Sequence, residues 1–116
     1  MKVLSLFDGI SCGMLALQRA GIPVECYDAF EIDKYAVTVS KRNFPVIVHH
    51  GNVYDGDFTQ FRGYDLLLGG SPCTYWSIAK KDREVDCNGE GFRLFKEYVR
   101  ALEESGCKYF LYENNY

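Results

Sequence analysis

A cysteine that follows a proline at the end of an apolar run is the residue of this sequence best placed for chemistry. Within the segment LLGGSPCTYWS, two glycines and Pro72 precede Cys73, so the thiol is expected to be presented rigidly in a loop. A thiolate is a nucleophile, but a cysteine with the ordinary pKa of about 8.5 is only slightly ionised at neutral pH. We therefore expect a helix N-terminus or a nearby cation to favour the anion. The alternative, an inert buried cysteine, suits Cys26 and Cys107 better because they lie within or beside predicted strands.

A carboxyl group is predicted to meet this thiol. Glu113-Asn114 directly follows the last predicted strand, and Cys73 comes shortly after the strand before it. Neighbouring parallel strands bring their carboxyl ends to one edge of the sheet, so Glu113 is expected beside Cys73. A glutamate near a chain end is otherwise solvated surface. Its assignment to a catalytic site therefore depends on the pairing with Cys73.

A glycine-bearing turn near the N-terminus favours a nucleoside ligand. Phe7-Asp8-Gly9-Ile10-Ser11-Cys12-Gly13 joins a predicted strand to a helix, and glycines there allow a tight turn and the close approach of a ligand. Glu31 follows Gly13 by 18 residues and could accept hydrogen bonds from a ribose diol. Asn52 follows the third strand and could accept a hydrogen bond from an adenine amino group. The glycine turn suits a dinucleotide as well as a methyl donor, and a surface glutamate or a loop asparagine without a ligand would also explain these residues.

The elements that must position these residues alternate between apolar runs of strand length and amphipathic stretches of helix length. This alternation predicts an α/β fold, a doubly wound and mostly parallel sheet whose ligands bind at the carboxyl ends of the strands. Gly21 should end the first helix, and Asp33 should cap the second. The third helix has an apolar face formed by Phe92, Phe95, Val99 and Leu102. Strands are expected at 2–7, 24–30, 46–50, 64–68 and 108–112, and helices at 12–20, 34–43 and 91–104.

The composition is that of one ordinary globular domain of 116 residues, with 47% apolar and 25% charged residues. No apolar run is long enough for a membrane helix, and an aspartate interrupts the apolar start of the chain before any cleavage-like site. The five cysteines include no C-x-x-C pair, so we expect no disulfide framework, no metal site and a reducing, cytoplasmic location. The net charge is −3 and the sequence contains no basic stripe, so a DNA partner would be bound largely by residues outside this chain.

Taken together, these motifs resemble those of the cytosine-C5 DNA methyltransferase family, and phage or prophage-type bacterial members look most similar. The likeness extends from Val3 to Asn115 and keeps the family's order and spacing. It implies a Rossmann-like, S-adenosylmethionine-dependent methyltransferase fold, truncated after the fifth strand. It also implies S-adenosylmethionine as cofactor, DNA as substrate, and a role in DNA methylation and restriction-modification.

The resemblance assigns roles to individual residues. Cys73 and Glu113 would be catalytic, and Ser77 and Asn114 would bind the substrate. Asn52 stands where the family has an aspartate, although an amide oxygen can still accept a hydrogen bond. The cofactor pocket would be formed by Phe7, Gly9, Gly13, Glu31, Asn52, Pro72 and Leu94.

The implied reaction begins with a cytosine flipped out of the DNA stack. Cys73 adds to C6 while Glu113 hydrogen-bonds at N3, C5 takes the methyl group of S-adenosylmethionine, and a base removes the C5 proton to release Cys73. Three alternatives stay open. They are a non-catalytic cofactor-binding remnant or split subunit that needs a C-terminal half, a tRNA cytosine methyltransferase, and an NAD-dependent oxidoreductase, in which Pro72-Cys73 would have no role.

The chain ends just past Glu113, so the target-recognition domain and the C-terminal elements that close the family's cofactor pocket are expected to be absent from it. The apolar run Tyr109-Phe110-Leu111-Tyr112 would then form an open sheet edge, which is prone to pairing. We expect a second copy of the chain, or a complementing C-terminal chain, to cover this edge.

Overall fold

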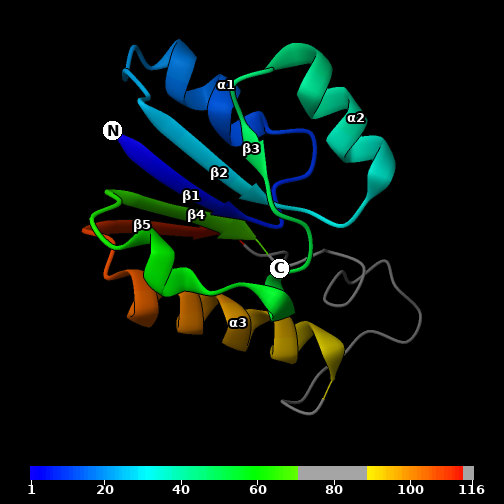
Figure 1. Ribbon diagram of the computed structural model, residues 1–116, viewed down its shortest axis with the longest axis vertical. Coiled ribbons are helices and arrows are strands. Elements are labelled where there is room, and N and C mark those ends of the chain that lie inside the picture. Colours follow the sequence, from blue (N-terminus) through cyan, green and yellow to red (C-terminus); the bar gives the residue numbers. More distant parts are fainter. Residues whose placement is uncertain (71–88, 114–116) are drawn as a thin grey trace.

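A computed structural model describes residues 1–70 and 89–113, which form a parallel five-stranded sheet with helices on both faces (Figure 1). The strand order is β3-β2-β1-β4-β5, and all neighbouring strands run parallel. Helices α1 and α2 cover one face of the sheet, and α3 covers the other (Figure 1). The predicted doubly wound α/β fold is therefore confirmed. The elements are β1 (Lys2–Leu6), α1 (Cys12–Arg19), β2 (Cys26–Phe30), α2 (Lys34–Asn43), β3 (Val48–His49), the 3₁₀ helices η1 (Val53–Asp55) and η2 (Phe58–Phe61), β4 (Leu66–Gly70), α3 (Glu90–Ser105) and β5 (Tyr109–Glu113).

Local sequence signals set the ends of the helices. The Asp33 carboxylate caps α2 by accepting hydrogen bonds from the main-chain N–H groups of Tyr35 and Ala36, at 2.9 and 3.2 Å. After α1, Gly21 has a φ of +73°, a left-handed conformation that favours glycine. Gly106 ends α3 in the same way, with a φ of 64°. The predicted cap of α2 and the predicted end of α1 are confirmed.

All five strands begin or end one or two residues away from the predicted bounds, and two differ most. β4 is displaced by two residues, to Leu66–Gly70, and β3 is shorter, with only Val48 and His49. Gly69 can remain in the strand because the missing side chain leaves room for the ring of Tyr98, which a β-carbon at position 69 would approach within 2.7 Å. The two 3₁₀ helices between β3 and β4 were not predicted.

The sheet separates two apolar clusters. Alternate strand residues point to opposite faces, so Leu4 and Leu6 join the cluster under α3, whereas Val3 joins the cluster under α1. On α3 the fully packed face contains Leu94, Tyr98 and Ala101, while Val99 of the predicted apolar face is 36% exposed. Tyr98 turns inward because its hydroxyl donates hydrogen bonds to the carbonyl oxygens of Leu67 and Leu111, which satisfies its polar atom inside the core.

β5 lies at one edge of the sheet, paired with β4. Three of its side chains are 60–62% exposed, those of Tyr109, Phe110 and Leu111. Along the part of the chain that the structure describes, no helix combines the length and the apolar character needed to span a membrane.

Candidate functional site

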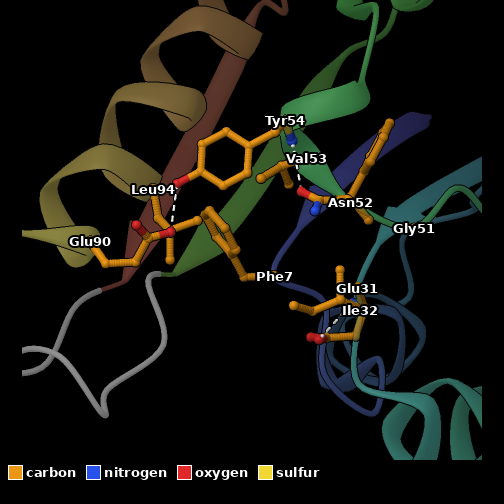
Figure 2. A pocket seen from close by; sticks show the side chains of 10 residues that line it. Phe7, Glu31, Ile32, Gly51, Asn52, Val53, Tyr54, Glu90 and Leu94 are labelled. Atoms are coloured by element: carbon orange, nitrogen blue, oxygen red, sulfur yellow. Dashed lines mark hydrogen bonds between the residues drawn. The ribbon is translucent and has the colours of Figure 1, made fainter.

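A cavity of about 280 Å³ lies where β1, β2 and β3 end, beside the N-terminal turns of α3 (Figure 2). Four of the residues predicted to bind a cofactor line it together, namely Phe7, Glu31, Asn52 and Leu94. Figure 2 shows the ring of Phe7 between Leu94 on one side and Glu31 with Ile32 on the other. We call this space the first cavity. It is lined by Phe7, Phe30, Glu31, Ile32, Gly51, Asn52, Val53, Tyr54, Glu90 and Leu94.

The loop between β1 and α1 has a strained backbone. Phe7, Gly9 and Ser11 have φ values of 56°, 62° and 69°, in the left-handed region that is costly for residues other than glycine. A β-carbon on Gly9 would meet no atom within 4 Å, so this glycine is required by its backbone conformation and not by crowding. The loop thus turns sharply at the mouth of the first cavity.

Asp8 holds this loop in place. Its carboxylate accepts hydrogen bonds from the hydroxyl groups of Ser5 at 2.7 Å and Tyr27 at 2.6 Å, and also from Ser11. Burial, followed by the charge of Asp8, raises the pKa of Tyr27, so the Tyr27 hydroxyl stays protonated as a donor. In the sequence, Asp8 was simply one of the polar residues after a strand, and the structure makes it the anchor of the turn.

Glu31 is fixed by main-chain donors. Its Oε1 accepts from the N–H of Gly9 at 2.8 Å, and its Oε2 accepts from those of Ile32 and Asp33, each at 3.0 Å. The half-buried carboxylate therefore joins the loop after β1 to the loop after β2. These bonds use three of its roughly four acceptor positions, which leaves capacity to accept a hydrogen bond from a ligand hydroxyl.

Gly13 has a packing role. A β-carbon at this position would lie 2.9 Å from Leu68 Cδ1 and 2.9 Å from the Tyr27 hydroxyl, so the glycine lets α1 approach the sheet closely. Gly13 does not line the first cavity. It lines a neighbouring space, described below.

Asn52 lies at the wall of the first cavity, but its side chain is already engaged. The amide oxygen accepts from the N–H of Tyr54 at 2.9 Å and caps the short helix η1. The Tyr54 hydroxyl in turn donates to Glu90 Oε1 at 2.7 Å, which connects η1 to the first residue of α3 (Figure 2). Burial and this hydrogen bond raise the pKa of Tyr54 to about 12.

Six lining residues were not assigned to the site by sequence reasoning, namely Phe30, Ile32, Gly51, Val53, Tyr54 and Glu90. Ile32 could have been found, because it directly follows Glu31 at the end of β2. Tyr54 and Glu90 gave no usable signal, since they are separated by 36 residues and meet only because α3 packs beside η1.

A second cavity of about 270 Å³ contains Glu113. In the pairing of β4 with β5, Gly70 is the register partner of Glu113, and a β-carbon on Gly70 would lie 3.0 Å from Glu113 Oε2. The missing side chain at position 70 therefore makes room for the glutamate. Phe7 lines both cavities, so the cavity with Glu31 and the cavity with Glu113 share one aromatic residue. This second cavity is lined by Ser5, Leu6, Phe7, Asp8, Cys12, Gly13, Leu68, Gly69, Gly70, Leu111 and Glu113.

The remaining predicted site residues lie outside the described part of the chain. These are Pro72, Cys73, Ser77 and Asn114. Their assignment stays a prediction. The described residue nearest in sequence to Cys73 is Gly70, which belongs to the second cavity.

Comparison with known proteins gives consistent matches over almost the whole chain. The family model described as "C-5 cytosine-specific DNA methylase" matches residues 1–115. The orphan methyltransferase M.SPRI of Bacillus phage SPR is 38% identical over 98% of this chain, and the type II methyltransferase M.HgiCII of Herpetosiphon aurantiacus is 34% identical over 97%. The chain spans only 26% and 25% of the length of these two relatives.

Solved structures agree with this result. A crystal structure of a Spodoptera frugiperda DNMT2 mutant superposes with a TM-score of 0.73 and 25% identity, covering 97% of this chain and 35% of that protein. S. pombe Dnmt2 methyltransferase gives a TM-score of 0.71 at 19% identity, covering 98% of this chain and 33% of its own, and supports the fold alone.

Proposed function

The chain belongs to the C-5 cytosine-specific DNA methylase family, and we propose that it forms the cofactor-binding and catalytic part of a DNA cytosine-C5 methyltransferase. The observation that carries this proposal is the arrangement of the two cavities. Methyl transfer needs a donor site and an acceptor site side by side, so that the reacting atoms are close and oriented. The first cavity, with Glu31, and the second cavity, with Glu113, share Phe7 as a wall and meet this requirement.

The first cavity suits the adenosine part of S-adenosylmethionine. Phe7, Val53 and Leu94 offer apolar surface for a base, and the anchored carboxylate of Glu31 offers an acceptor for ribose hydroxyls. Gly9 shapes the turn beside it, Gly13 lets α1 pack closely against the sheet, and we assign Pro72 to the same site. S-adenosylmethionine, when bound, supplies an electrophilic methyl group.

The second cavity is proposed to hold the target cytosine, flipped out of the duplex. There the thiolate of Cys73 forms a bond to C6, and Glu113 hydrogen-bonds at N3 and stabilises the charge that develops on the ring. After methylation at C5, a base takes the C5 proton, the electron pair of that bond restores the ring double bond, and the sulfur leaves as thiolate. Ser77 and Asn114 are assigned to contacts with this cytosine.

Trapping on DNA that contains 5-fluorocytosine tests this function. Fluorine at C5 cannot leave as a proton, so the bond between Cys73 and C6 should persist as a covalent complex detectable by mass spectrometry. The Cys73→Ser variant should form no complex, whereas Cys26→Ser, a control cysteine at the start of β2, should form as much as the parent. With a complementing C-terminal segment supplied, binding of S-adenosylhomocysteine without any covalent complex would instead indicate a non-catalytic remnant. A complex with tRNA in place of duplex DNA would reassign the substrate.

DNA binding is proposed to need protein beyond these 116 residues, because the net charge is −3 and the chain covers about a quarter of its relatives. The exposed residues of β5 are the natural place for that protein to join, and we assign the edge to a complementing C-terminal segment. Light scattering with and without such a segment tests this. A stable monomer that does not bind the segment would contradict it, and concentration-dependent dimers would indicate a second copy instead.

A further inference from the structure

The end of the first cavity away from Glu31 holds another carboxylate, that of Glu90. Building on the function proposed above, we propose that Glu90 accepts a hydrogen bond from the exocyclic amino group of the adenine, and so selects a 6-amino purine over a 6-oxo purine. Sequence reasoning had given this acceptor role to Asn52.

The position of Glu90 is set by the fold. It is the first residue of α3 and lines the cavity together with Leu94, one turn further along the helix. Tyr54, which extends from η1, donates its hydroxyl hydrogen to Glu90 Oε1 at 2.7 Å and so holds the carboxylate at the cavity (Figure 2). The Tyr54 hydroxyl is protonated at neutral pH, and its raised pKa of about 12 keeps it a donor well into the alkaline range.

Asn52 is less suited to the role because of its own hydrogen bond. Its amide oxygen accepts from the Tyr54 N–H at 2.9 Å, which leaves one of its two acceptor positions, and the other end of its side chain is an NH₂ group, a donor that cannot accept from an adenine amino group. Glu90 has more acceptor capacity and carries a negative charge. Its two oxygens offer about four acceptor positions, of which Tyr54 uses one. Arg93 Nη1 lies 3.9 Å from Glu90 Oε2 in an exposed ion pair, too long for a hydrogen bond.

The cavity also gives the ligand a direction. Ribose hydroxyls at Glu31 place the sugar at one end, and the base then extends past Phe7 and Val53 toward Leu94, where Glu90 stands (Figure 2). An adenine amino group at that end donates to the carboxylate. A 6-oxo purine turns a carbonyl oxygen toward the same carboxylate, so two acceptors face each other and binding is weakened.

Calorimetry on the full chain with S-adenosylhomocysteine and S-inosylhomocysteine tests the inference. The parent should bind the adenosyl compound at least tenfold more tightly than the inosyl compound. Glu90→Gln should reduce this preference to less than threefold, because a glutamine amide can accept from the amino group or donate to the oxo group. Tyr54→Phe should reduce it partly, because the carboxylate loses its anchor. Glu103→Gln, an exposed glutamate elsewhere on α3, is the matched control and should keep the full preference.

The outcomes separate the two proposals. An unchanged preference in both Glu90→Gln and Tyr54→Phe, with circular dichroism showing folded variants, overturns the role of Glu90 and leaves the cofactor site standing. Failure of the parent to bind either compound overturns the cofactor site, and the role of Glu90 with it. If Glu90→Gln does not fold, the Tyr54→Phe preference decides alone.

Discussion

Replacing Glu31 with glutamine should destabilise the ligand-free protein, because the carboxylate joins two loops by three main-chain hydrogen bonds. A glutamine has nearly the same shape but only one oxygen. If that oxygen keeps the N–H groups of Ile32 and Asp33, its NH₂ group faces the Gly9 N–H, and a donor meets a donor. One hydrogen bond to a charged group is lost and two are weakened. Since such a bond contributes about 1.5–3 kcal/mol, we expect the free energy of unfolding to fall by about 2 kcal/mol.

Urea unfolding without ligand measures this effect. The matched control is Glu25→Gln, which removes an exposed carboxylate that lies 3.6 Å from the N-terminal ammonium and is 69% exposed. Exposed ion pairs contribute little, so Glu25→Gln should change the free energy of unfolding by less than about 0.5 kcal/mol. A decrease equally small in Glu31→Gln would refute the view that Glu31 holds the loops, and would leave it only a role toward a ligand.

Three further changes probe the surroundings of the site. Gly13→Ala should lower the free energy of unfolding by about 1–3 kcal/mol in urea unfolding, because the added methyl group meets Leu68 and Tyr27 at 2.9 Å, and wild-type stability would show that α1 can shift. Asn52→Ala should cost about 1 kcal/mol in the same assay by removing the cap of η1, and no loss would mean that the cap is dispensable. Burial lowers the pKa of His49 below its ordinary value of 6.5, so the unfolded chain binds a proton at a higher pH than the folded protein does. The free energy of unfolding should therefore decrease as the pH falls through 6.5. His49→Asn should flatten this part of the pH profile of the unfolding free energy, and an unchanged slope would contradict the assignment.

The sequence predicted the elements and the edge of the sheet where the site lies, because these depend on local signals. The apolar runs, the Asp33 cap and the glycine turn each depend on residues that are only a few positions apart in the sequence. The packed face of α3 was predicted less well, because Tyr98 was not counted as a core residue. Its burial is favourable because its hydroxyl group hydrogen-bonds to carbonyl groups of β4 and β5. The contact between Tyr54 and Glu90 could not be predicted from the sequence for a related reason. It joins segments 36 residues apart, and it depends on the packing of α3 beside η1.

The strained backbone of the loop after β1 costs free energy, and the proposed chemistry gives a reason for this conformation. Phe7 could relax to an ordinary extended conformation only if the chain did not turn at Asp8, but Asp8 is held by Ser5, Ser11 and Tyr27. Conformations of this kind persist where the surrounding structure over-determines them, and they cluster at functional sites. Here the result is that Phe7 stands in the walls of both cavities. A residue of normal backbone geometry would continue the line of β1. The strained one turns aside, and Phe7 thereby lines both the cavity with Glu31 and the cavity with Glu113.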